Sequence, residues 1–183
     1  NQDIYLYDFT SKELARLTTN IAIDTEANYS PDGKSIVFMS NRSGQMQIYI
    51  KNLESGVTFR VPIEGNYNAK PSYSPDGTKL VLIHEISGNN RLALFDIENN
   101  NLNVLTRNKL DDSPSFSPNS KMIIFSTKRN NKGLVAIVNL NNMQIVELTI
   151  KDGSVIEPSW SDYSKDDSNT TKETTTSNNN TSI

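Results

Sequence analysis

A repeat of about 44 residues runs through most of the chain and constrains its fold more than any other feature. The motif Ser-Pro-Asp-Gly at residues 30–33 recurs at residues 74–77 and, altered to Ser-Pro-Asn-Ser, at residues 117–120. The first serines of these copies stand at positions 30, 74 and 117, so they are 44 and 43 residues apart. An aromatic residue precedes each copy, and a fourth remnant follows Trp160. A repeat of this length indicates stacked copies of one structural unit.

A second landmark keeps the same period. Alternating segments that end in Asp or Asn and an apolar residue occur at residues 4–9, 48–53, 92–97 and 135–140. Because side chains point to opposite faces of a strand at every second residue, a period of two predicts strands rather than helices.

Each unit is expected to hold four antiparallel strands. In the second unit we predict strands at residues 71–74, 79–84, 91–97 and 102–106. Pro75-Asp76-Gly77 is a turn, since Pro presets φ and Gly accepts a left-handed backbone. Four strands in roughly 40–45 residues are typical of a β-propeller blade. A β-sandwich is the alternative, but it does not require every hairpin to repeat its turn.

We therefore predict an all-β chain, the C-terminal part of a β-propeller, over residues 1–164. It holds three whole blades at about 21–64, 65–108 and 109–151, preceded by two outer strands at 4–9 and 13–18. A lone inner strand at 157–161 is expected to close a ring of six blades by completing a blade that lies mostly upstream of Asn1. Residues 165–183 are polar and of low complexity, which predicts a disordered tail.

Composition excludes several kinds of site. The chain has no Cys, so disulfides, Cys-based zinc sites and thiol catalysis are absent. A net charge of -3 argues against a nucleic-acid partner, and the apolar runs are too short for a membrane-spanning helix. His84 is the one histidine and could serve as the base of a serine-hydrolase triad. The chain has no Gly-x-Ser-x-Gly elbow to supply the nucleophilic serine of such a triad. We expect no enzymatic activity, cofactor or metal, although the pair Asp111-Asp112 leaves open a cation in the channel.

The repeat units resemble the C-terminal β-propeller of the TolB family. The resemblance is carried by Asp24-Thr25-Glu26 before an aromatic-Ser-Pro-Asp-Gly, by residues 36–43 leading into 47–49, and by residues 110–115. It is most specific at the end, where residues 152–155 are followed by Pro-Ser-Trp-Ser and Tyr163. The match is collinear over about 1–164. Ser120 departs from the family's turn, so it is expected to adopt a left-handed backbone at a cost of about 1–2 kcal/mol.

This resemblance implies a function. TolB proteins are periplasmic components of the Tol–Pal system, so the implied partner is Pal, the peptidoglycan-associated lipoprotein. An N-terminal domain outside this sequence would engage the other Tol proteins, and the implied role is to support outer-membrane integrity and cell division. The alternatives are the substrate-filtering propeller of a prolyl-oligopeptidase-like serine peptidase and a glycan-binding propeller.

The propeller geometry indicates which residues could bind a partner. The Ser-Pro-Asp-Gly turns lie on one face and are nearly identical, whereas the connections between blades lie on the other face and vary. Variable residues on a repeated scaffold are typical of binding surfaces. The candidate partner-binding residues are Asp24, Thr25, Glu26, Asn68, Lys70, Asp111, Asp112 and Glu157. The loops at 41–45, 85–90 and 128–132 lie on the same face.

Overall fold

The computed structural model describes residues 1–148 and 153–161, and within them every regular element is a β-strand. A hairpin of β1 (Tyr5–Tyr7) and β2 (Leu14–Arg16) is followed by three four-stranded antiparallel sheets. The first sheet contains β3 (Asp24–Tyr29), β4 (Ser35–Ser40), β5 (Gln47–Asn52) and β6 (Thr58–Arg60). The second contains β7 (Asn68–Tyr73), β8 (Lys79–Ile86), β9 (Asn89–Asp96) and β10 (Asn101–Val104). The third contains β11 (Asp112–Phe116), β12 (Met122–Arg129), β13 (Lys132–Asn139) and β14 (Ile145–Leu148).

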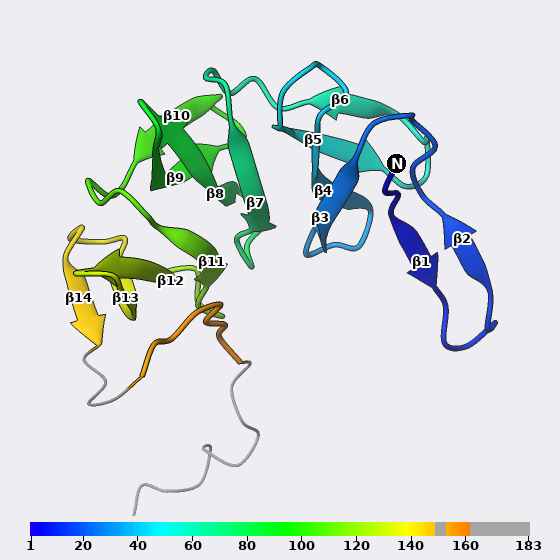
Figure 1. Cartoon of the computed structure of the whole chain (residues 1–183). Coiled ribbons are helices and arrows are strands. Elements are labelled where there is room, and N and C mark those ends of the chain that lie inside the picture. The colour runs from blue at the N-terminus through cyan, green and yellow to red at the C-terminus, as the bar shows by residue number, and fades with distance from the viewer. Residues whose placement is uncertain (149–152, 162–183) are drawn as a thin grey trace, which may run out of the picture.

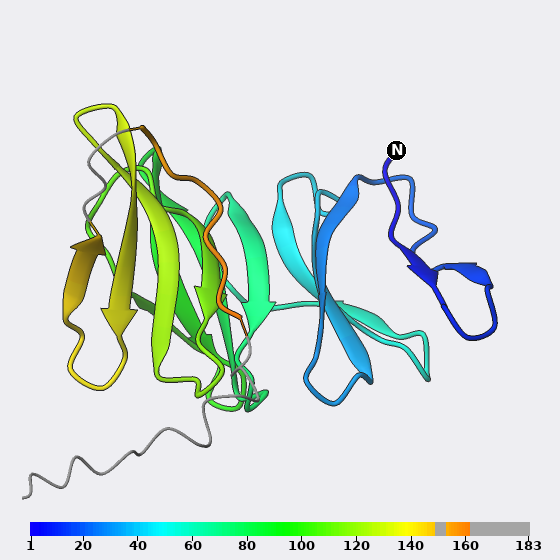
Figure 2. The same ribbon diagram turned by 90° about the horizontal axis from the view of Figure 1, so that it is seen from below.

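The sheets stand side by side as propeller blades. Figure 1 shows them along an arc, with β3, β7 and β11 toward its inside, and Figure 2 shows the same blades from below. The order within each sheet follows the chain, from the inner to the outer strand. The predicted fold class and the predicted division into three blades and an outer hairpin are therefore confirmed. The predicted tail at 165–183 lies outside the described residues.

The repeated turn owes its sequence to a small hydrogen-bond network. In the first copy, the Ser30 hydroxyl donates to Asp32 Oδ1 at 2.6 Å and accepts from the backbone N–H of Ser35 at 2.9 Å. Asp32 Oδ1 also accepts from the N–H of Lys34 at 3.1 Å. The bond from the Ser30 hydroxyl and that from the N–H of Lys34 lower the pKa of Asp32. Gly33 has a φ of 70°, which an L side chain rarely adopts.

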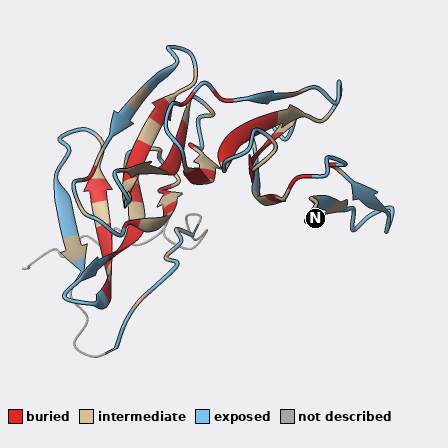
Figure 3. Ribbon diagram, turned by 45° about the horizontal axis from the view of Figure 1, so that its top comes forward, coloured by how far each residue is buried: buried red, intermediate tan, exposed pale blue. Residues whose placement is uncertain are grey.

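The core lies between the blades. One buried cluster joins the first and second four-stranded sheets and includes Val37, Ile50 and Leu82. Another joins the second and third sheets and includes Val81 and Phe125. Leu82 and Val81 are neighbours on β8, so alternate side chains of one strand serve the two clusters. Figure 3 shows this burial concentrated in the middle strands of each sheet, while the outer strands and the β1–β2 hairpin are mostly exposed.

Each inner strand is interrupted by a β-bulge. Between Thr25 and Asn28, β3 advances three residues while β4 advances two, and β7 and β11 shift register in the same way. One residue of each bulge has a positive φ, at 54° in Glu26, 51° in Lys70 and 49° in Ser113. Such a bulge bends the strand and redirects its side chains.

The expected inner strand at 157–161 does not form as a strand. These residues pair with no strand of the described chain, and the expected closure with a blade that lies mostly upstream of Asn1 stays a prediction. The segment nevertheless repeats the inner-strand backbone, because Glu157 has a φ of 53°. It lies against the third blade, where the backbone N–H of Trp160 donates to Ser115 Oγ at 3.4 Å. Extended backbone without a ladder of hydrogen bonds is not sheet.

Candidate protein-binding site

The three bulge residues of positive φ and Glu157, which shares their backbone conformation, line one pocket on the inside of the arc. In three of the four copies its walls repeat the pattern of a residue of positive φ, a proline and a serine, and its volume is about 320 Å³. The four residues of positive φ in it are Glu26, Lys70, Ser113 and Glu157. Their positions differ by 44, 43 and 44, so one backbone device contributes four different side chains to one pocket.

Polar contacts connect these side chains from blade to blade. Glu26 Oε2 accepts a hydrogen bond from the backbone N–H of Lys70 at 3.1 Å. Lys70 Nζ in turn donates to Ser113 Oγ at 3.1 Å and pairs with Asp112 Oδ1 at 3.0 Å. Glu157 is exposed at the other side of the pocket. This pocket and Asp112 together are called the channel mouth below.

Carboxylates dominate the electrostatics of the channel mouth. Burial works to lower the pKa of Lys70, but the hydrogen bond with Asp112 and the charges of Asp112, Glu26 and Glu157 outweigh it, so the pKa rises. Burial also raises the pKa of Tyr67, and the charges of Glu26 and Asp112 add to that rise. Both shifts are consistent with three carboxylates facing one cation. A ligand of this site should present basic or amide groups.

Three candidate residues lie inside the blades rather than at the channel mouth. Asp24 is 1% exposed and accepts two hydrogen bonds from Arg42 Nη2, both at 2.9 Å. Asn68 is fully buried and donates to Gln47 Oε1 at 2.8 Å. Asp111 is fully buried and accepts hydrogen bonds from the hydroxyls of Thr106 and Thr127.

These three residues occupy equivalent positions in the repeat. Each is held by different polar partners. A buried polar group needs such partners, because leaving it unpaired costs about 1–3 kcal/mol. The structure therefore divides the eight candidates. Glu26, Lys70, Asp112 and Glu157 surround the channel mouth, Thr25 is half-buried on β3, and the other three are buried.

The bulge in β3 explains why Asp24 is buried while Glu26 lines the pocket. In a regular strand, residues two apart face the same side, so Asp24 and Glu26 should share a face. The extra residue breaks this alternation, and Ser113 joins the pocket although the sequence did not mark it as a candidate. The proline inside β7 and β11, at 71 and 114, was the available signal, because proline within a sheet is confined to edges and bulges.

His84 takes part in the buried polar network. Its Nδ1 lies 2.8 Å from Asn68 Oδ1, and burial lowers its pKa. Among residues 1–148 and 153–161, no group of three or more His, Asp or Glu side chains could hold a metal ion. Within the same residues, no helix is long and apolar enough to cross a membrane.

Comparison with known proteins identifies the family. A family model described as the TolB β-propeller domain matches residues 1–164. The chain belongs to the TolB β-propeller family. The Tol–Pal system protein TolB of Bordetella pertussis is 38% identical over 152 residues, which cover 83% of this chain and 35% of that protein. The crystal structure of TolB from Acinetobacter baumannii is 39% identical with a TM-score of 0.80, over 86% of this chain and 40% of that one.

The chain thus spans between a third and a half of these two TolB proteins. The fold is also shared with peptidases, such as a puromycin-hydrolysing peptidase of Mycobacterium tuberculosis at 14% identity and a TM-score of 0.61. Identity that low shows the propeller fold alone. The relatives with substantial identity are Tol–Pal proteins, which agrees with the prediction of a chain without enzymatic activity.

Proposed function

We propose that this TolB propeller binds a partner protein at the channel mouth, and that the partner is the periplasmic lipoprotein Pal. The chain would then act in the periplasm, where the complex would support outer-membrane integrity and cell division. Membership of the TolB family supports the Tol–Pal assignment.

One observation carries the choice of surface. The three bulges and the similar backbone at Glu157 place four different side chains in one pocket, whereas the opposite face repeats the same turn three times with the same internal hydrogen bonds. The turn residues use their polar atoms within the turn, while Glu157 and the carboxylate of Asp112 remain accessible. A rigid scaffold with variable polar groups is suited to specific recognition.

Charge should govern the rate of this association. Because the channel mouth is acidic, a complementary partner is steered toward it, and salt screens this steering. We therefore expect association with Pal to slow as ionic strength rises.

The test is calorimetric titration of Pal into the full chain. The variant Glu26→Gln keeps an acceptor for the Lys70 N–H, and Glu157→Lys reverses an exposed charge. Together they should weaken binding by about tenfold or more, since close charge pairs at interfaces commonly couple at this strength.

The matched control makes the same charge change on the turn face, Glu54→Gln with Glu98→Lys, at two exposed residues. Asp32 and Asp76 are unsuitable controls because they hold their turns together. Loss of binding in the control alone would place the interface on the turn face. No binding of Pal by the unaltered chain would reject the proposed partner.

A further inference from the structure

A second pocket, with the opposite charge, lies between the second and third blades. It has a volume of about 480 Å³ and is lined by four cations, three Asn, Thr127, Leu110 and a single carboxylate. The cations are Arg107, Lys109, Lys128 and Arg129, all of them exposed. This cluster is called the basic pocket below. It is unusual in a chain whose net charge is -3.

Most of the positive charge in the basic pocket is uncompensated. Its carboxylate, Glu147, pairs with Arg129 at 2.8 Å between Nη2 and Oε1. This pair shows that a carboxylate oxygen can reach a guanidinium in the pocket. Within the described residues, Arg107, Lys109 and Lys128 make no ion pair. Asp111, which follows the lining residue Leu110, is fully buried and accepts hydrogen bonds from the hydroxyls of Thr106 and Thr127.

The backbone that presents these cations is fixed from both sides. The N–H of Asn90, in the second blade, donates to the carbonyl of Lys109 at 3.1 Å, and the N–H of Asp111 donates back to the Asn90 carbonyl at 3.1 Å. Asn108 Nδ2 donates to Thr127 Oγ1 at 3.3 Å, which ties the loop to the end of β12. The pocket is therefore formed before any ligand arrives, which reduces the entropy cost of binding.

We propose that the basic pocket binds an acidic peptide segment through its Asp and Glu carboxylates. Asn108, Asn130 and Asn131 supply amides suited to the peptide backbone between the carboxylates. Within a hollow lined by several cations, successive carboxylates of an extended acidic segment can each meet a different positive charge. The inference does not depend on the identity of the partner at the channel mouth.

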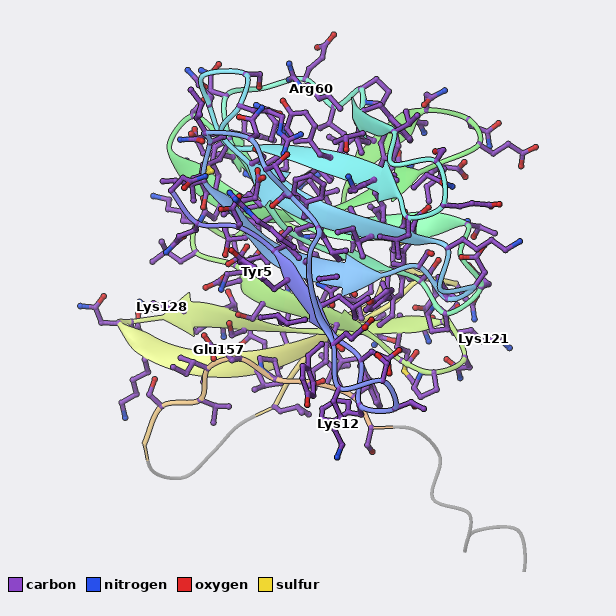
Figure 4. The ribbon with its side chains drawn as sticks, turned by 90° about the vertical axis from the view of Figure 1, so that its right-hand side faces the viewer. Tyr5, Lys12, Arg60, Lys121, Lys128 and Glu157 are labelled. Carbon is purple, nitrogen blue, oxygen red and sulfur yellow. The ribbon has the colours of Figure 1, made fainter. Side chains whose placement is uncertain are left out.

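The position of the basic pocket favours a protein ligand. Lys128 lies at the end of β12 that carries the connections between blades, and Lys121 lies at the turn end; Figure 4 shows the two at opposite sides of the molecule, with Glu157 on the side of Lys128. Lys109 precedes by three residues Asp112, which pairs with Lys70 at the channel mouth. One face thus carries an acidic site, the channel mouth, and a basic site, the basic pocket. A basic ligand would favour the first and an acidic ligand the second.

The test measures fluorescence anisotropy of a labelled peptide of alternating Asp and Ser added to the full chain. A peptide with Asn in place of Asp is the neutral probe. The variant Lys109→Glu with Lys128→Glu should lower the affinity for the acidic peptide by about tenfold at least. Binding of the acidic peptide to the unaltered chain should weaken as salt rises. The matched control, Lys12→Glu with Lys121→Glu, makes the same charge change at two exposed lysines outside the pocket and should stay within about twofold of the unaltered chain.

Several outcomes would overturn the inference. These are equal binding of the neutral and acidic peptides, equal weakening in both double variants, or no binding of the acidic peptide. Binding only to phosphatidylglycerol vesicles would assign the pocket to lipid instead. The channel-mouth variant Glu26→Gln with Glu157→Lys should keep its affinity for the acidic peptide, so failure at one site is distinguishable from failure at the other.

Discussion

Asp32, Asp76 and Asn119 occupy the same place in three consecutive turns, and each directs Oδ1 to the backbone N–H two residues later, at 3.1, 3.0 and 3.1 Å. The change to Asn119 keeps this acceptor, so the third turn retains its hydrogen bonds. The last turn residue differs more, because Ser120 replaces glycine at a φ of 58°. Here the sequence predicted the backbone correctly, since the turn type demands a left-handed residue.

Ser120→Gly is expected to stabilise the chain by about 0.5–1 kcal/mol. Relief of the left-handed backbone gains about 1–2 kcal/mol, and the greater entropy of glycine in the unfolded chain offsets part of it. Loss of the 3.3 Å bond from the Asp76 N–H to Ser120 Oγ offsets a little more. The change should appear in urea denaturation as a higher midpoint at an unchanged slope.

Gly33→Ser is the matched reverse substitution. Gly33 has a φ of 70° and no atom within 4 Å of an added Cβ, so the substitution tests backbone strain without a steric clash. It should lower the free energy of unfolding by a similar amount. If Ser120→Gly destabilises the chain while Gly33→Ser is neutral, the backbone argument fails.

At the scale of the element, the second strand of each blade is the one whose position in the fold is clearest from its sequence. β8 carries Leu80, Val81, Leu82 and Ile83 at 1% exposure or less, because blades cover both of its faces. Such a strand appears in sequence as a continuous apolar run. The outer strands are short and alternate weakly, yet the repeat places them, because each copy supports the assignment in the others.

The inner strands were the hardest element to predict. Simple alternation would put Asp24 and Glu26 on one face, and it fails because one inserted residue changes the phase of every side chain after it. Four of the eight candidate residues therefore lie at the channel mouth and three are buried, while the binding of a partner on this face stays a proposal. The segment at 157–161 could be recognised as an inner-strand copy, but strand pairing depends on neighbours that this copy does not contact.

Gly133→Ala is expected to displace the segment that carries Trp160. A Cβ on Gly133 would lie 2.4 Å from Ser154 Oγ and 2.7 Å from the backbone oxygen of Val155, so this backbone must move. The Gly133 N–H also donates to Ser154 Oγ at 2.9 Å, which fixes the segment against β13. Trp160 is the only tryptophan, so its fluorescence should shift to the red as it becomes more exposed.

The control for this variant is Gly88→Ala, which changes a hairpin glycine with no atom within 4 Å of the added Cβ. It introduces local backbone strain at a φ of 76° but should leave the emission of Trp160 unchanged. An unchanged emission in Gly133→Ala would mean that residues 153–161 hold their position without this close approach.

At the scale of the whole molecule, each blade contacts its neighbours through apolar clusters and a few polar bonds. The Glu26–Lys70, Lys70–Ser113 and Asp76–Ser120 bonds each join residues 43 or 44 apart, so each links one blade to the next. Stability in such a repeat is approximately the sum of unit and nearest-neighbour terms. A unit between two neighbours is therefore held more firmly than a unit at one end.

Hydrogen exchange should reveal this gradient along the chain. The second blade contributes to apolar clusters on both of its sides, so the amides of β8 and β9 should exchange slowest. The β1–β2 hairpin packs through one cluster only, by way of Ile4 and Leu17, and leaves Leu14 65% exposed. Its amides should exchange about 100-fold faster or more, because few buried contacts oppose its local opening. Mass spectrometry of the exchanging full chain measures both regions in one experiment. Equal protection of β1–β2 and β8–β9 would show that the chain opens as a single unit, and the nearest-neighbour description would then be wrong.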